Sequence, residues 1–398
     1  MKEINSIINH HIKNGLYPGV EWKIIHKNET YQGKAGVLDL SSKENIHNNS
    51  FYRIWSMTKP IISVVILQLL EEKKIKLENF IVDYLPQFSK LKVLSNKQAS
   101  ISDVVDIKNI PTIKDLLLHT AGFSYNFMDD PVGKEYHREG LFNSSDTTLE
   151  EEINLLSTLP LLYEPSTHWV YSVSVDVLAR IIEVVTGSTL QEELKKRIFV
   201  PLNMQDTGFS ITKENLPRLM TSYQYDAVKN QLVEPIINSR KIASYGYPTN
   251  KKNYARGGIG LFSTIDDYTK FAQMLLTGKT QKKEIILSKQ MLATATKNHL
   301  PSSFLPYEIK NFDVEELEEN EFEPYGFGLG FRVMIDPQQY YGIDNVGGSV
   351  GEFGWAGAAS TYFLVDPKND LIAVLMTQVF EDAAILKKDF VKNIYKNI

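Results

Sequence analysis

The sequence predicts an α/β (α+β) fold in which one antiparallel sheet is built from both ends of the chain and holds an inserted helical region. Residues 20–26 and 30–37 look like the two strands of a hairpin, and strand-like segments return towards the C-terminus. Between these ends, apolar residues recur at helical spacing. Strands at both ends with helices between them favour one shared sheet. We expect residues 1–55 and 220–398 to form the α/β domain and residues 56–219 a mainly helical region, with the functional site between them.

Each predicted helix has a helical pattern of apolar residues or a clear stop signal. A short amphipathic helix precedes Gly15 and Pro18, and the helix at residues 174–185 is stopped by Gly187. The strongest pattern predicts a helix that opens at Ser56 and ends near Lys73. The other predicted helices are residues 113–118, 190–198 and 266–276.

The C-terminal part of the chain changes to a strand pattern. Three strands are predicted, at residues 327–334, 358–365 and 371–377, and they are separated by Asp-Pro and Lys-Asn-Asp turns. Residues 380–398 are predicted to close the chain as a helix, and the acidic residues 315–321 to form a solvated loop.

The composition limits the classes of function. The chain has 398 residues, 43% hydrophobic and 23% charged, which is typical of a globular protein rather than a disordered one. There is no cysteine, so disulfides, thiolate catalysis and cysteine-ligated metals are excluded. The net charge of −5 and the lack of a basic run argue against nucleic-acid binding. No signal peptide or membrane-length apolar run is visible, so we expect a cytoplasmic protein without a membrane partner.

Two serine motifs compete for the centre of any acyl-transfer chemistry. Residues 347–351 (GGSVG) fit the G-x-S-x-G pattern of a nucleophile elbow around Ser349. That motif needs a following helix and then an acid and a histidine. Residues 352–357 are too glycine-rich to start a helix, and the last histidine is His299. Ser349 is therefore predicted to lie in a turn and not to be a nucleophile.

The pattern Ser-x-x-Lys occurs at Ser56, Ser89 and Ser210. Only Ser56 opens a long apolar helix, and Pro60 fixes where that helix begins, since proline is tolerated only near the first turn. Ser56 and Lys59 then lie on one helix face, within reach of each other.

Two interpretations of Ser56 are open on the residues alone. A serine at this place most often caps the helix. The other interpretation is a nucleophile, because a serine hydroxyl becomes reactive when a neighbouring base takes its proton. A lysine can be that base where its surroundings favour the neutral amine, and free N–H groups at a helix N-terminus stabilise developing negative charge. Lys59 could instead pair with a surface carboxylate, but the apolar neighbours Ile61 and Ile62 favour a buried position.

Four further segments carry a resemblance to a known family. Leu116–Gly122 (LLLHTAG) is similar to an LLxHTSG turn, and Tyr163–Ser172 (YEPSTHWVYS) to the PGT-x-W-x-YS element. Arg256–Thr264 (RGGIGLFST) is similar to a GGGLxST element, and Gly354–Thr361 (GWAGAAST) to a GWGGAAGT strand. Together they resemble class C β-lactamase-like serine hydrolases, esterase branch, which includes family VIII carboxylesterases and related acyltransferases. The resemblance implies a β-lactamase/penicillin-binding-protein-like sandwich.

The resemblance also implies roles for individual residues. Ser56 would be the acylated nucleophile, Lys59 its proton acceptor, and Tyr171 the tyrosine that shares the acid–base role. The backbone N–H groups of Ser56 and of Ala358, expected on the edge strand, would form the oxyanion hole.

The pocket residues follow from where this sequence departs from the β-lactamase motifs. Trp355, with Gly357 two residues later, replaces the Lys-Thr-Gly strand motif, which favours neutral or aromatic acyl esters. Val173 stands where β-lactamases have asparagine. Tyr125, just after the LLLHTAG turn, is expected either to line the pocket or to be scaffold.

The sequence therefore predicts a serine hydrolase that cleaves a small-molecule carboxylic ester, or a small amide, through an acyl-enzyme on Ser56. No metal or cofactor is expected, because the eight histidines form no ligand pattern. Two alternatives stay open: an acyltransferase that uses the same acyl-enzyme, and a non-catalytic penicillin-binding-like protein. β-Lactamase activity ranks lower because of Trp355 and Val173, and the sequence predicts no oligomeric state.

Overall fold

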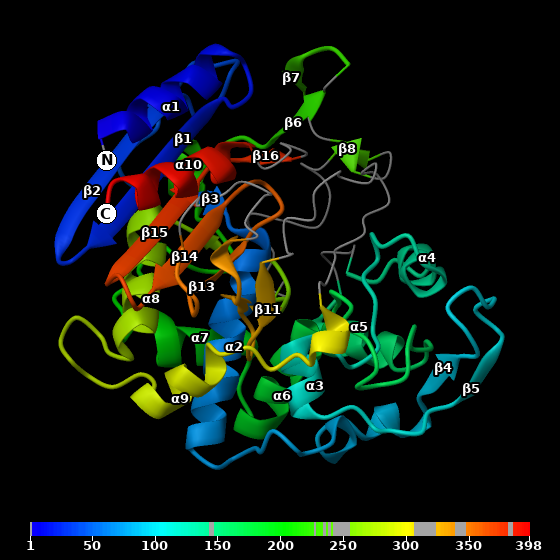
Figure 1. The fold of residues 1–398 in the computed structure, drawn as a ribbon. Coiled ribbons are helices and arrows are strands. Elements are labelled where there is room, and N and C mark those ends of the chain that lie inside the picture. Colours follow the sequence, from blue (N-terminus) through cyan, green and yellow to red (C-terminus); the bar gives the residue numbers. More distant parts are fainter. Residues whose placement is uncertain are drawn as a thin grey trace.

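A seven-stranded antiparallel sheet organises the structure, which is a computed structural model (Figure 1). It describes residues 2–142, 147–226, 228–233, 236–237, 240–241, 255–305, 324–338, 348–380 and 385–398. The strand order is β11-β12-β13-β14-β15-β1-β2. The strands are β1 (Gly19–His26), β2 (Glu29–Gly36), β11 (Tyr325–Phe327), β12 (Arg332–Met334), β13 (Phe353–Ala356), β14 (Tyr362–Asp366) and β15 (Leu371–Met376).

The two ends of the chain meet in this sheet because β1 pairs with β15. Trp22 of β1 lies opposite Leu375, and Lys23 lies opposite Val374. Since neighbouring residues in a strand point to opposite faces, each face has its own cover. Trp22 packs against Phe390 of α10 (Ile385–Lys396), while Lys23 pairs with Asp266 of α8 (Ile265–Thr277). The sheet is thus the middle layer between α10, which contacts α1 (Lys2–Lys13), and α8.

The helical region is assembled around α2 (Thr58–Glu71), which runs through the middle of the view in Figure 1. Its side chains are buried almost throughout, since the segment is apolar on all faces. It packs against α6, α7 and α9. The remaining helices are α3 (Ile113–Leu118), α4 (Pro131–Arg138), α5 (Leu149–Leu156), α6 (Ser174–Thr186), α7 (Leu190–Leu194), which continues as a π-helix (Lys195–Phe199), and α9 (Lys289–Ala295).

Short strands form small sheets beside the large one. β3 (Tyr52–Arg53) lies just before Ser56 in the chain, and its pairing with β10 (Phe262–Ser263) brings the segment around residue 260 beside the serine. The other small sheets are β4 (Lys92–Leu94) with β5 (Val104–Asp106), β6 (Tyr223–Asp226) with β7 (Gln231–Val233) and β16 (Val379–Phe380), and β8 (Ile236–Ile237) with β9 (Arg240–Lys241).

The predicted N-terminal hairpin and the six predicted helices before residue 277 are present, with ends shifted by a few residues. The helix predicted to open at Ser56 begins instead at Thr58, after a 3₁₀ turn (η1, Trp55–Met57). The chain-closing helix begins at Ile385, and the acidic loop at 315–321 lies outside the described residues.

The C-terminal strand pattern was wrong in two places. Residues 327–334 are not one strand: Gly330, at φ +93°, sits in a turn between β11 and β12. The strand predicted from residue 358 begins at Tyr362, and the glycine-rich segment before it, which its composition favoured as a turn, contains β13, at the place where the family resemblance implied a strand. Position 354 of β13 requires a glycine, because a Cβ there would clash with the backbone carbonyl of Phe363.

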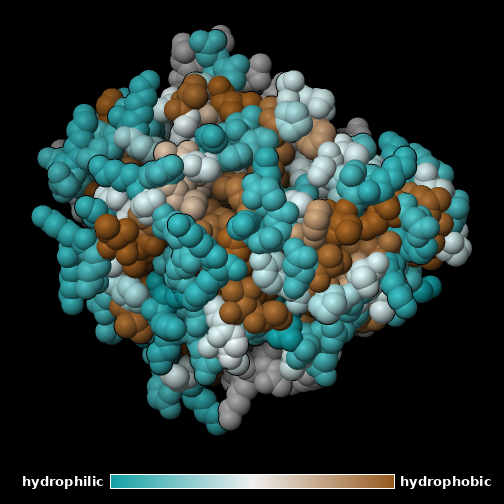
Figure 2. Space-filling model, turned by 90° about the horizontal axis from the view of Figure 1, so that it is seen from below, coloured by the Kyte–Doolittle hydropathy of each residue, from teal (hydrophilic) through white to brown (hydrophobic). Residues whose placement is uncertain are grey.

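A large hydrophobic core extends from the sheet into the helices and is shared by both predicted domains. The domain boundaries near residues 55 and 220 stay a prediction. Figure 2 shows a face covered mostly by hydrophilic side chains with apolar atoms between them, which is ordinary for a folded protein. Within the described residues, every helix is too short or too polar to cross a membrane.

Candidate active site

Ser56 lies in the tight turn that precedes α2. The residue before it, Trp55, has a left-handed φ of +46°, and its ring packs edge-on against Phe380 at 5.2 Å. The N-cap of α2 is Met57, and no side chain caps this helix. Ser56 therefore does not cap the helix, and its half-buried hydroxyl is free for other contacts.

Lys59 lies one turn further along α2, with only 2% of its surface exposed. Its Nζ atom is 3.3 Å from Ser56 Oγ, and it donates to the Tyr125 hydroxyl at 3.1 Å and to the Gly258 carbonyl at 2.9 Å. The amine also lies 4.6 Å from the centre of the Tyr171 ring. Among the described residues Lys59 forms no ion pair, so the surface-carboxylate alternative for this lysine is wrong.

Tyr171, on the segment that leads into α6, completes the contacts of the serine. Its hydroxyl donates to Ser56 Oγ at 2.7 Å. His119 holds this segment, because its Nδ1 accepts the N–H of Ser172 at 3.3 Å and its ring lies 5.1 Å from that of Tyr171. Burial, and next the charge of Lys59, lower the pKa of His119 well below its usual value. His119 is therefore a neutral support for the tyrosine.

Aromatic rings surround this cluster. Trp355 of β13 lies 5.6 Å from the Tyr171 ring and 5.5 Å from that of Phe327. Tyr125 stacks on Phe127 with 4.6 Å between ring centres. Val173 is fully buried at the start of α6.

The two N–H groups predicted to form an oxyanion hole have no hydrogen-bond acceptor among the described residues. The prediction that Ala358 lies on an edge strand is wrong. Ala358 lies in an exposed turn between β13 and β14, and the edges of the sheet are β11 and β2. This turn packs against the segment before Ser56: Thr361 donates to the Ile54 carbonyl at 3.4 Å, and a Cβ at Gly357 would clash with the same carbonyl.

The rival serine Ser349 is part of a structural turn. It is 4% exposed, and its Oγ accepts a hydrogen bond from Asn369 at 2.9 Å. The same amide also donates to Asp366 at 2.8 Å. Ser349 therefore has a partner that fixes a turn at the end of β14.

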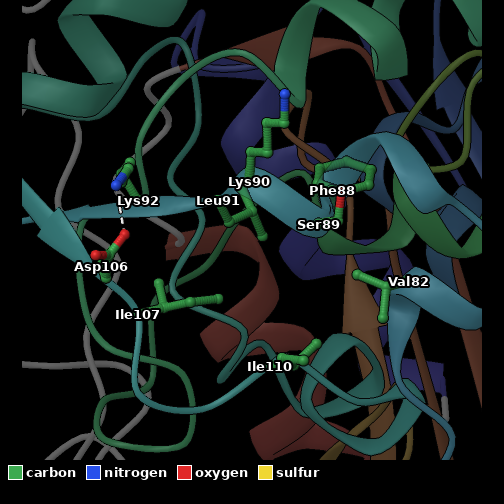
Figure 3. A pocket seen from close by; sticks show the side chains of 9 residues that line it. All are labelled: Val82, Phe88, Ser89, Lys90, Leu91, Lys92, Asp106, Ile107 and Ile110. Atoms are coloured by element: carbon green, nitrogen blue, oxygen red, sulfur yellow. Dashed lines mark hydrogen bonds and ion pairs between the residues drawn. The ribbon is translucent and has the colours of Figure 1, made fainter.

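The other two Ser-x-x-Lys patterns lie on the surface. Ser210 is exposed. Ser89 is also exposed, at a pocket of about 500 Å³ between the segment around Phe88 and the β4–β5 pair (Figure 3). In Figure 3, Lys92 turns to Asp106, with which it forms an ion pair. The lysine of this pattern thus has a carboxylate partner on the neighbouring strand.

The sequence analysis did not predict the Gly258 carbonyl or Asp176 at the site, and it named Tyr125 without its contact to Lys59. Tyr125 was expected to line the pocket or to be scaffold, but it also accepts a hydrogen bond from Lys59. The Gly258 carbonyl is a second acceptor for the same amine, and Asp176 holds the Gly257–Gly258 backbone with its Oδ1 at 2.9 Å from both nitrogens. Nothing local in the sequence marks these contacts, because each joins segments far apart in the chain.

Comparison with known proteins identifies the family of the chain. The family model described as Beta-lactamase matches residues 4–394. Lovastatin esterase of Penicillium rubens is 28% identical over 358 residues, which cover 86% of this chain and 84% of that protein. Esterase EstB of Burkholderia gladioli is 28% identical over 251 residues, or 61% of each chain. The structure of EstCE1, a hydrolase with promiscuous acyltransferase activity, has a TM-score of 0.80, with 23% identity and coverage of 98% and 97%.

The chain belongs to the β-lactamase family. This confirms the resemblance inferred from the motifs and the predicted sandwich fold.

Proposed function

We propose that the protein is a serine hydrolase that cleaves a carboxylic ester through an acyl-enzyme on Ser56. One observation carries the proposal: Ser56 Oγ lies 2.7 Å from the Tyr171 hydroxyl and 3.3 Å from Lys59 Nζ. Ser56 lies in the turn before α2, and its side chain does not cap that helix. Two groups that can hold and move a proton thus converge on a single hydroxyl.

The geometry supports a complete acylation step. Ser56 Oγ attacks the ester carbonyl carbon, and its proton passes to the neutral amine of Lys59. The negative charge that forms on the carbonyl oxygen is held by the N–H groups of Ser56 and Ala358. Tyr171 delivers a proton to the leaving alkoxide, and the C–O bond breaks. Water then attacks the acyl-enzyme, its proton returns through the same groups, and the carboxylic acid is released.

The aromatic surroundings support a neutral acyl ester as substrate. Trp355 presents a ring beside Tyr171 where the β-lactamase motif has a lysine. A ring gains binding energy from apolar contact and does not pair with a carboxylate. We therefore expect p-nitrophenyl esters of aromatic or medium-length acids to be cleaved faster than β-lactams, and small amides to be cleaved slowly.

Acyl transfer is the second candidate. The solved structure of EstCE1 belongs to a hydrolase with promiscuous acyltransferase activity, and its fold matches this chain almost throughout. An alcohol acceptor would take the place of water in the second step. Faster loss of the acyl-enzyme on addition of alcohol, with formation of the new ester, would favour transfer.

The proposal is tested by labelling with a fluorophosphonate probe and by ester turnover. Ser56→Ala is expected to lose labelling and at least about 1,000-fold of kcat/KM, because the nucleophile is gone. Ser349→Ala is the matched control, since Ser349 is buried and carries the rival motif. Full labelling of Ser56→Ala, or loss confined to Ser349→Ala, would contradict the proposal. A wild-type protein that takes no label would favour the non-catalytic alternative.

A further inference from the structure

A buried carboxylate lies beside the site without touching the serine. Asp176, in the first turn of α6, is 1% exposed. Its Oδ1 accepts the N–H groups of Gly257 and Gly258, both at 2.9 Å. Its Oδ2 is buried and has no hydrogen-bond partner among the described residues. A buried carboxylate oxygen without a hydrogen bond is costly, so its presence here needs a physical reason.

The Gly258 backbone separates this oxygen from the amine of Lys59. A Cβ added to Gly258 would lie 2.7 Å from Asp176 Oδ2 and 3.2 Å from Lys59 Nζ. It would also clash with the Tyr125 hydroxyl. The carboxylate and the amine therefore approach the same point, over a range at which opposite charges stabilise each other. Only a residue without a side chain leaves the space for this.

Asp176 acts on the amine by a second route as well. By holding both N–H groups of the turn, it fixes the Gly258 carbonyl, which accepts a hydrogen bond from Lys59 at 2.9 Å. One oxygen of the Asp176 carboxylate thus fixes the backbone carbonyl that accepts from Lys59, and the other oxygen faces the amine.

Among the residues that the structure describes, few charged or titratable groups lie around this pair. Burial raises the pKa of Asp176, and the charge of Lys59 is the first of the influences that oppose it. Arg256 opposes it more weakly and is itself paired with Glu152 at 3.2 Å. The groups that face Lys59 from the surrounding elements are Asp176 of α6, Tyr125, Tyr171 and the neutral His119.

We propose that Asp176 is the positioning residue of Lys59: its carboxylate fixes the Gly258 carbonyl against the amine and faces that amine with its other oxygen. The proposal rests on the proposed role of Lys59 as the base. Once Lys59 has taken the Ser56 proton, the negative charge of Asp176 stabilises the new ammonium and speeds the acylation step.

Asp176→Asn separates charge from shape, because the amide oxygen can still accept both N–H groups. The kcat should fall about ten-fold, since the ammonium that forms on Lys59 loses its charged partner, while KM changes little. The substrate is a p-nitrophenyl ester, and the cooperative melting transition is followed in parallel.

The matched control is Asp267→Asn on α8. Asp267 is also buried, accepts a backbone N–H from Asp206 at 2.7 Å and pairs with Lys270 at 2.8 Å. Asp267→Asn is expected to cost stability but to leave kcat and KM at their wild-type values.

An unchanged kcat in a folded Asp176→Asn protein would overturn the proposal. Should that variant not fold, Asp176→Ser is a second neutral replacement whose kcat must fall while KM changes little. Asp176→Glu keeps the charge and must restore part of the kcat that Asp176→Asn loses, and a Glu variant no faster than the Asn variant would also overturn the proposal. Fluorophosphonate labelling of Asp176→Asn distinguishes the two proposals: a labelled Ser56 with an unchanged kcat rejects only the role of Asp176, whereas labelling that survives Ser56→Ala rejects the proposed function.

Discussion

Ser56–Lys59 and Ser89–Lys92 have the same four-residue pattern in opposite surroundings. Lys59 is 2% exposed, and its amine lies among a serine, two tyrosine rings and a backbone carbonyl. Lys92 is 46% exposed and pairs with Asp106, which is 85% exposed. The comparison teaches that the pattern acquires chemistry only where the fold buries the lysine beside the serine, because a lysine in water stays an ammonium, which has no lone pair to accept a proton.

The largest expected effect comes from removing each lysine in turn. Lys59→Met keeps the length and burial of the side chain but removes the amine, and kcat/KM should fall about 100- to 10,000-fold, the range typical of a general base. Lys92→Met removes the same group from the surface pattern and should leave ester turnover within about two-fold. Steady-state kinetics on a p-nitrophenyl ester measures both. Equal losses in the two variants would mean that the surroundings of the lysine do not matter.

An intermediate effect is expected from the surroundings themselves. Tyr125→Phe removes one of the acceptors of the Lys59 amine and keeps the ring that stacks on Phe127. The kcat should fall about five-fold, the equivalent of about 1 kcal/mol for one hydrogen bond. Tyr84→Phe is the matched control, because its half-buried hydroxyl donates to Asn79 at 2.8 Å in the helical region. A loss above about 100-fold in Tyr125→Phe would instead give that hydroxyl a direct part in proton transfer.

The smallest effect is expected at the surface pair. Asp106→Asn breaks the ion pair with Lys92, but exposed pairs contribute less than about 1 kcal/mol to the free energy of unfolding. The melting temperature should therefore change by no more than a few degrees, and ester turnover should not change. Differential scanning calorimetry of the variant beside the wild type measures the shift. A large drop in melting temperature would show that this pair holds the β4–β5 strands together.

The local signals in the sequence located most helices and the candidate serine, because periodicity and proline placement act over a few residues. Pro60, for example, lies in the first turn of α2, as expected. The β-lactamase family and its sandwich fold also followed from short motifs. The precise start of α2 did not, since the left-handed Trp55 that precedes it is held by packing against Phe380, more than 300 residues away.

What the sequence could not supply depends on contacts between distant segments. Composition alone did not mark β13, because its glycines are typical of turns, and the close approach of the Phe363 carbonyl explains Gly354 within a strand. Asp176 looked like any polar residue at the start of a helix. Its relation to Lys59 exists only because Gly257 and Gly258 are brought between the two helices α2 and α6.

The pairing of β1 with β15 has a consequence for how the protein is made. The first strand leaves the ribosome with only β2 as a partner, and its other edge stays open until residues 371–376 arrive. An open strand edge invites pairing with other chains. The turn before Ser56 likewise waits for the segment around Thr361 and for Phe380. Nearly the whole chain must therefore be synthesised before the turn that positions Ser56 can form. A truncated or nascent chain is expected to aggregate readily and to show no ester cleavage.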